Sequence, residues 1–228
     1  MRSTDPRSKV WKLQVPVSLE YAEMLVLYRD PPRDQVACSE CEASNWHEPL
    51  VVEWDSGSDK IGDFTHARAR IVTKEAVADE LLQRFHGFTK GRIEMPDHPK
   101  LRRPQRVTKR TPKRVWLPYS GPELVELCVS REIPLLPGSS AIIDWVCQQC
   151  GRIIYKGFEG LEEKTTRSHV PREEGKGLYF GEADLSGADF FRPRFTGLTL
   201  CTDGARRFIQ ERAYSNIEFL DVGDIVPA

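Results

Sequence analysis

Residues 142–155 read IIDWVCQQCGRIIY, and this stretch anchors the interpretation of the whole chain. It contains a C-x-x-C pair, Cys147 and Cys150, with Gly151 directly after it. The flanking segments 142–146 and 152–155 are rich in β-branched residues and predict two strands joined by a tight turn. Glycine after the pair allows a positive φ, so that backbone N–H groups can point at the sulfurs. Two thiolates on one such turn can face the same tetrahedral Zn²⁺, which is typical of one half of a zinc ribbon.

A second C-x-x-C pair lies far upstream and reads Cys38-Ser39-Glu40-Cys41. A self-contained zinc finger places its two pairs only about 15–20 residues apart. If both pairs share one ion, that ion clamps the start of the chain to its middle and removes entropy from the unfolded state. We therefore predict one structural Zn²⁺ with four ligands: Cys38, Cys41, Cys147 and Cys150. Glu42 follows the first pair where glycine would suit the turn better, so this turn is expected to be less ideal.

Three other interpretations of the two pairs remain open. A redox-active C-x-x-C site is one, since Trp145 and Val146 before Cys147 faintly resemble a thioredoxin site, although no βαβ unit frames it. Two others are knuckles that have lost their metal and a site in which His47 replaces a thiolate. The remaining cysteines, Cys128 and Cys201, lie on apolar faces of expected elements and are interpreted as small buried hydrophobic residues.

The composition is that of a folded soluble protein. Of 228 residues, 39% are hydrophobic and 29% charged, which is enough for a core and too apolar for a disordered chain. Six cysteines are too few for a disulfide scaffold. No apolar run reaches the roughly 18 residues that span a bilayer, and residues 1–15 do not form a secretory signal. We expect a soluble, cytoplasmic protein with one large domain or two small ones.

Short strands are predicted at 10–17, 24–28, 50–54, 92–95 and 217–222, where apolar or β-branched residues gather between turn residues. Three short helices are predicted among them. The first is capped by Thr73 and carries Val77, Leu81 and Phe85 on one face. The second opens at the capping-box spacing of residues 120–123, and the third runs from about Thr202 to about Ala213. The predicted class is α+β: mixed small sheets with three or so short helices, joined by a zinc-ribbon-like double C-x-x-C site. The second helix is expected to carry Leu124, Leu127 and Cys128 on one side.

A weak internal echo accompanies the first and third helices. Asp63-Phe64 precedes a strand ending at Thr73, a helix and a strand at 91–95. Asp189-Phe190 precedes a strand ending at Thr202, a helix and a strand at 217–220. A diverged duplication and a coincidence of common helix chemistry both account for so few identities.

A basic segment divides the chain. Residues 100–114 hold eight of the 33 basic residues and none of the 34 acidic ones, so the rest of the chain carries a net charge of −9. Two prolines keep the segment from being a helix. It is interpreted either as a flexible arm for nucleic acid or an acidic partner, or as a solvated loop between packed halves. The predicted organisation is an N-terminal α+β part at 10–100, this linker at 100–114 and a C-terminal α+β part at 115–228, or else one continuous domain.

The sequence does not predict an enzyme. It contains no H-E-x-x-H, G-x-S-x-G or P-loop pattern. The acid pairs Glu162-Glu163 and Glu173-Glu174 are adjacent residues, which do not face one site. A four-thiolate zinc site would also be coordinatively closed, leaving no position for a substrate water. We therefore predict no catalytic residues, no small-molecule substrate and no cofactor other than zinc.

With these motifs in place, the sequence resembles the myxobacterial double-CXXCG-motif paralogous family, whose members are described as immunity proteins of swapped lipoprotein toxins. The resemblance rests on the two knuckles, their order along the chain and the C-terminal run at 188–192, 200–208 and 217–220. The segment Pro122-Glu123-Leu124-Val125-Glu126-Leu127 also fits. One departure is clear: Glu42 stands where the family has glycine, which bears on metal binding at the first knuckle.

The resemblance implies that the protein neutralises a cognate protein toxin by stoichiometric binding that occludes it. The acidic balance outside 100–114 would suit a basic, nuclease-like toxin. Neither a membrane nor a nucleic acid is an expected partner. Two rival functions are a zinc-ribbon nucleic-acid-binding or regulatory protein that uses residues 100–114, and a zinc or thiol oxidoreductase with an exposed cysteine of low pKa.

Overall fold

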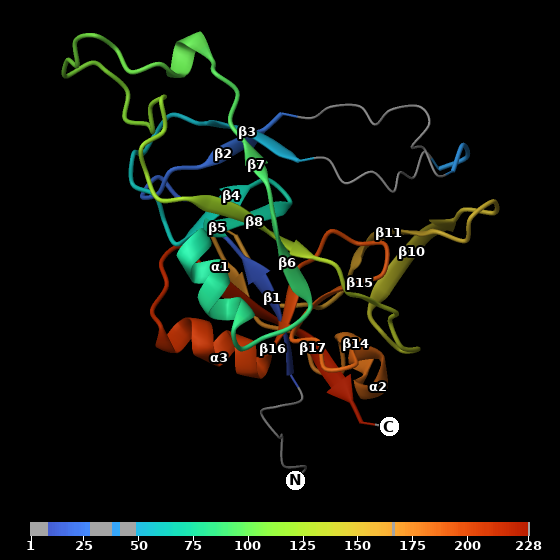
Figure 1. Cartoon of the computed structure of the whole chain (residues 1–228). Helices are drawn as coiled ribbons and strands as arrows, with labels where there is room; N and C mark the ends of the chain where they lie inside the picture. Colours follow the sequence, from blue (N-terminus) through green and yellow to red (C-terminus); the bar gives the residue numbers. More distant parts are fainter. Residues whose placement is uncertain (1–8, 28–37, 42–48, 166, 228) are drawn as a thin grey trace.

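The fold, taken from a computed structural model, is built around an antiparallel sheet and a mixed sheet, each with a helix on one face (Figure 1). The structure describes residues 9–27, 38–41, 49–165 and 167–227. Residues 1–8, 28–37 and 42–48, which include Tyr28, Glu42 and His47, lie outside the described residues.

The smaller of these sheets has four strands in the order β4-β5-β8-β6, each antiparallel to its neighbours. Helix α1 connects β5 to β6, which lie on either side of β8. We call these five elements the α1 unit. Their bounds are β4 (Phe64–Ala67), β5 (Arg70–Lys74), α1 (Glu75–Leu82), β6 (Phe88–Gly91) and β8 (Leu124–Val129).

The larger sheet has six strands in the order β14-β17-β1-β16-β15-β9. Helix α3 connects β16 to β17, which lie on either side of β1, and both are antiparallel to it. We call β15, β16, α3, β17 and β1 the α3 unit. The bounds are β1 (Lys9–Gln14), β9 (Glu132–Ile133), β14 (Leu178–Gly181), α2 (Glu182–Leu185), β15 (Phe190–Pro193), β16 (Leu200–Thr202), α3 (Asp203–Glu211) and β17 (Glu218–Val226).

Three small sheets complete the described part of the fold. The hairpin β10–β11 carries the second C-x-x-C pair in its turn, and it extends away from the α1 unit in Figure 1. The others are a three-stranded sheet, β2-β3-β7, and a two-stranded one, β12-β13. The bounds are β2 (Met24–Val26), β3 (Leu50–Trp54), β7 (Ile93–Glu94), a 3₁₀ helix (Pro99–Leu101), β10 (Ala141–Val146), β11 (Ile153–Phe158), β12 (Glu163–Lys164) and β13 (His169–Val170). The α+β class is confirmed, with mixed small sheets and three α-helices among the residues that the structure describes.

A single apolar cluster joins the two units. It draws Leu81 and Phe64 from the α1 unit and Ile209 and Phe190 from the α3 unit, all of them fully buried. Helices α1 and α3 consequently lie close together, as Figure 1 shows at the left of the molecule. A second cluster lies on the other side of the α3 unit, and a third lies around β2 and β3. Apolar burial at about 25 cal/mol per Å² makes these clusters the main source of stability.

The predicted second helix is wrong. Residues from Leu124 form β8, in the interior of a sheet, where β5 and β6 satisfy its backbone N–H and C=O groups on both sides. Four consecutive buried residues, 124–127, suit a strand covered by α1, and Val125 and Val129 favour extended backbone. The capping-box spacing of residues 120–123 is therefore overridden by tertiary structure.

The other two helices are confirmed, with one correction. Thr202 is the N-cap of α3, and its hydroxyl accepts from Ala205 N. Thr73, predicted to cap α1, instead lies in β5, where its hydroxyl donates to Asp63 O at 2.8 Å. The N-cap of α1 is Lys74, which makes no side-chain capping bond.

Both large sheets draw strands from both sides of residues 100–114. Strand β8 follows this segment yet lies in the α1 unit, and β1 precedes it yet lies in the α3 unit. Among the described residues, no helix is long and apolar enough to cross a membrane.

Candidate metal centre

The second knuckle is a tight turn between two strands, as predicted. Gly151 adopts a φ of +72°, the left-handed conformation that glycine tolerates best. Its N–H donates to Cys147 O at 2.9 Å, and Cys147 N donates to Arg152 O at 2.8 Å. These bonds close the end of the β10–β11 hairpin and place Cys147 and Cys150 on one turn.

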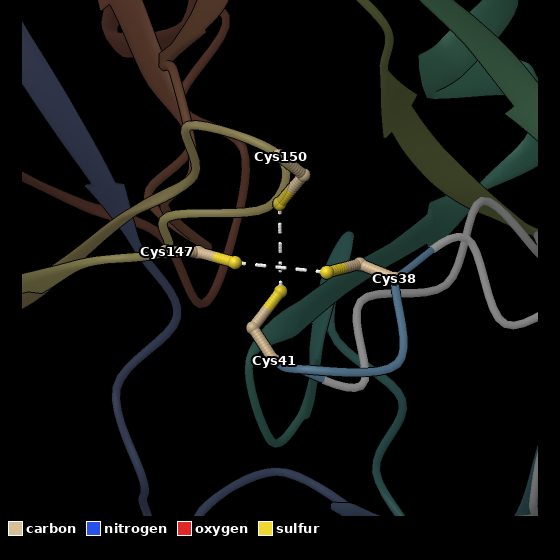
Figure 2. Close-up of side chains that lie close together, drawn as sticks. All are labelled: Cys38, Cys41, Cys147 and Cys150. Atoms are coloured by element: carbon tan, nitrogen blue, oxygen red, sulfur yellow. Dashed lines mark hydrogen bonds between the residues drawn. The ribbon is translucent and has the colours of Figure 1, made fainter.

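Four sulfurs meet between this turn and the first knuckle, Cys38–Cys41. The Sγ atoms of Cys38 and Cys147 lie 3.6 Å apart, as do those of Cys41 and Cys150. All four sulfurs lie within 4.8 Å of one another, and none is in a disulfide. A tetrahedral ion with bonds of about 2.3 Å requires sulfurs about 3.8 Å apart. Figure 2 shows the side chains converging on a common centre, so the predicted ligand set is brought together and could hold a metal ion.

A reciprocal contact between the knuckles fixes their relative position. Glu40 N donates to the side-chain oxygen of Gln149 at 3.2 Å, and Gln149 N donates to the carboxylate of Glu40 at 3.0 Å. Each residue holds the third position of its own C-x-x-C. Ser39 Oγ also donates to Gln149, at 3.2 Å. The sequence reasoning missed Glu40 and Gln149, and their shared position within the motif was the one available signal.

Backbone N–H groups point at the first sulfur of each pair. Those of Cys41 and Glu40 lower the pKa of Cys38 to about 7. In the other knuckle, burial raises the pKa of Cys147 to about 12, although the N–H groups of Cys150 and Gln149 oppose this. Thiols this close cannot all ionise unless a cation compensates their charge. A divalent metal supplies that compensation, and metal binding then releases protons.

The burial of the four ligands is uneven. Cys38 and Cys147 are buried, Cys41 is intermediate and Cys150 is exposed. With four thiolates the coordination sphere is full, so the site can fix two chain segments but offers no position for a substrate or water. Soft thiolate donors in tetrahedral array suit zinc.

The other candidate residues lie away from this centre. Cys128 belongs to β8, and Cys201 belongs to the apolar cluster that joins the two units. Burial raises the pKa of Cys128 to about 12, so its thiol stays protonated. Cys201 is fully buried, as predicted, whereas Cys128 is only partly so. Over the residues that the structure describes, the four cysteines are the only group of three or more metal-ligating side chains.

The basic segment is a loop outside the sheets, and Figure 1 shows it at the upper left. Arg102 pairs with Asp97, and Arg114 lies over the ring of Trp116, 5.5 Å from its centroid. Its other cations are exposed: Lys100, Arg103, Arg106, Lys109, Arg110 and Lys113. The exposure fits both the solvated loop and the arm for an anionic partner.

No protein-family model and no curated protein matches the sequence.

Proposed function

We propose that this chain is an immunity protein that binds a cognate protein toxin stoichiometrically and occludes it, with one structural zinc in the four-cysteine cluster. The observation that carries the proposal is the meeting of the two C-x-x-C pairs on which the family resemblance rests. Two C-x-x-C pairs so far apart in the sequence are not expected to bring their sulfurs within 4.8 Å of one another unless they share a role. The assignment of a toxin as the partner rests on the resemblance alone.

The proposed mechanism is occlusion without chemistry. A rigid face with complementary charge is sufficient for such binding, and no catalytic residue is needed. Zinc would hold the β10–β11 hairpin to the first knuckle and so keep that part of the surface in one shape. The net charge of −9 outside residues 100–114 supports a basic toxin, and a nuclease is the class that we propose.

The zinc is tested by metal analysis of reduced, purified protein. We expect about one zinc per chain, as a four-thiolate site requires. The variant Cys147→Ser/Cys150→Ser should lose it, and Cys128→Ser is the matched control because that thiol lies outside the cluster. Wild-type protein without zinc, or a control that also loses it, would contradict the metal assignment.

Toxin binding is tested with the product of the neighbouring gene, purified as a catalytically inactivated protein. Calorimetry should show a complex of one to one, and co-expression should restore growth to cells that make the active toxin. Charge reversal of exposed acids such as Glu173 and Glu174 should weaken binding and flatten its salt dependence. Unchanged affinity in these variants would rule out the electrostatic part of the proposal, and absence of any complex would rule out the whole.

A second candidate function is nucleic-acid binding through residues 100–114. The observation in its favour is the row of exposed cations on a projecting loop. Counterion release would give a steep fall of affinity with salt, with a slope of about −0.9 per phosphate contact on duplex DNA. Substituting Arg103, Arg106, Lys109 and Arg110 by Gln should abolish it. A shallow slope in wild-type protein would reject this candidate.

A further inference from the structure

One cavity lies where the two units and the knuckle hairpin meet. Its volume is about 1020 Å³, which is at the upper limit for small-molecule sites. Strand β1, the β4–β5 turn, β11, β12 and the loop at 195–199 all contribute to it. Its apolar lining includes the rings of Tyr155, Phe158 and Phe195, with Leu198 beside them.

One lysine in this lining stands out by its neighbours. Lys12 lies in β1, directly between Leu200 of β16 and Leu220 of β17. Both leucines are buried in an apolar cluster, with exposed fractions of 0% and 3%. A charged residue at the centre of a sheet, flanked by buried leucines, normally has a counter-charge.

No such counter-charge is in contact with Lys12. Among the described residues, none makes a hydrogen bond or ion pair to its ammonium group. Burial lowers its pKa, and the exposed Glu163 opposes this only through longer-range attraction. The two other acids of the lining are already engaged: Glu162 with His169 and Asp221 N, and Glu218 with Lys164.

The equivalent position in the α1 unit shows what is missing. There Glu126 lies in the middle strand β8, opposite Val72 and Gly91 on the flanking strands. It is buried, but both of its carboxylate oxygens accept from the guanidinium of Arg70. The same place in the same topology is thus occupied by a paired charge in one unit and by Lys12 in the other.

We propose that this cavity binds a small organic anion with an apolar body, its carboxylate, sulfonate or phosphate group paired with Lys12 and its body packed on Phe158 and Phe195. The aromatic lining would bury the body, and Lys12 would gain the counter-charge that the fold does not give it. The proposal is independent of toxin neutralisation, because it rests on the cavity and Lys12 alone.

The test uses 8-anilinonaphthalene-1-sulfonate, which fluoresces when its aromatic body is buried, and N-phenyl-1-naphthylamine, which has the same body without the sulfonate. We expect one sulfonate probe per chain, bound at least tenfold more tightly than the neutral one. Lys12→Met should weaken the sulfonate probe at least tenfold and leave the neutral probe unchanged. Lys156→Met, an exposed lysine of β11 outside the cavity lining, is the control and should change neither.

Two further variants keep the proposal falsifiable if Lys12→Met does not fold. Lys12→Arg retains the charge and should retain binding, and Glu163→Gln removes the competing carboxylate and should strengthen binding severalfold. Equal affinity for both probes would overturn the assignment. So would a loss of sulfonate binding in Ile143→Ser, on the exposed apolar face of β10, with none in Lys12→Met.

Discussion

The α1 and α3 units share one topology, but they assemble it differently. In each, a hairpin leads into a helix and then into a strand, and a further strand inserts between the two that flank the helix. The orders β4-β5-β8-β6 and β15-β16-β1-β17 correspond strand by strand, with every neighbouring pair antiparallel. The inserted strand β8 comes from the chain soon after β6, whereas β1 comes from the far end of the sequence.

The contacts between the units are reciprocal as well. Asp63, before β4, accepts from the backbone N–H and the hydroxyl of Ser215, after α3, at 2.8 Å each. Asp189, before β15, accepts from the N–H of His86, after α1, at 3.1 Å. Phe64 and Phe190 follow these two acids, and each packs edge-to-face on a ring that follows the other unit's helix, Tyr214 or Phe85. Such symmetry supports a diverged duplication over a coincidence of helix chemistry.

The comparison shows that two units of one chain can share a topology with few identical residues. The sequence echo aligned Thr73 with Thr202. In the hairpins, however, Phe64 lies opposite Thr73 and Phe190 lies opposite Cys201, so the registers align Thr73 with Cys201 and Lys74 with Thr202. The echo therefore identified the right segments with an error of one residue. Capping, buried charge and aromatic contacts differ between the two units, and the following experiments measure by how much.

The largest loss of stability is expected at Phe64 and Phe190, the phenylalanines at equivalent positions of the two units. Phe190→Ala should destabilise the protein by about 3–5 kcal/mol, since it removes a fully buried ring that also packs on Phe85 and Phe88. Phe64→Ala should cost less within that range, because Phe64 has one such ring partner, Tyr214. Urea unfolding of both full-length variants checks this. Equal losses would mean that ring contacts do not distinguish the units.

The paired aspartates come next. Asp63→Ala should cost about 1–3 kcal/mol, because it leaves Ser215 N and its hydroxyl without their acceptor and removes the ion pair with Lys74. Asp189→Ala should cost less, since its side chain accepts from His86 N and, at 3.3 Å, from the hydroxyl of Thr202. The exposed Glu174→Ala is a control with little expected effect. A larger loss for Asp189 would reverse the proposed ranking.

The helix caps should differ by about 1 kcal/mol. Thr202→Ala removes the side-chain acceptor at the start of α3, whereas Lys74→Ala removes no cap from α1 because none is present. Thermal melts should show the shift for Thr202→Ala, and Lys74→Ala should show only the weaker loss of its ion pair with Asp63. A clear drop for Lys74→Ala alone would disprove this assignment of the caps.

The smallest expected effect is a change in how the stability of the protein depends on acidic pH. Burial would raise the pKa of Asp63, but hydrogen bonds from Ser215 and Lys74 outweigh it and hold the pKa below its ordinary value. The ionised form is thus favoured by folding, so its contribution is present above about pH 4 and is lost as the pH falls further. Asp63→Asn should therefore lose stability less steeply than wild type between about pH 4 and 2. Parallel slopes in the two proteins would count against a depressed pKa.

Local patterns predicted much of the molecule. The four ligands, the glycine turn and the β10–β11 hairpin follow from spacing within a few residues, and α3 follows from its cap and periodicity. The strand at 124–129 did not, because its backbone partners β5 and β6 decide its conformation, while its own residues also fit a helix face. Glu40 and Gln149 were missed for the same reason: their contact exists only once two segments 109 residues apart are brought together.

The cavity lay beyond the reach of sequence reasoning. Lys12, Phe158 and Phe195 are separated by long intervals and share no motif. Nothing local in β1 indicates that the neighbours of Lys12 will be two buried leucines. The prediction of no small-molecule substrate came from missing catalytic motifs, and that observation carries no information about a binding cavity.

The place of β1 also bears on the order in which the parts of the chain can form during synthesis. Trp11 and its partner Asp203 are 192 residues apart, so at about 5–20 residues per second β1 waits roughly 10–40 s for its partners. The α1 unit, complete by Val129, can form well before that. Until β16 and β17 emerge, β1 lacks both strands that flank it in the fold, so its backbone N–H and C=O groups stay open to pairing with other chains.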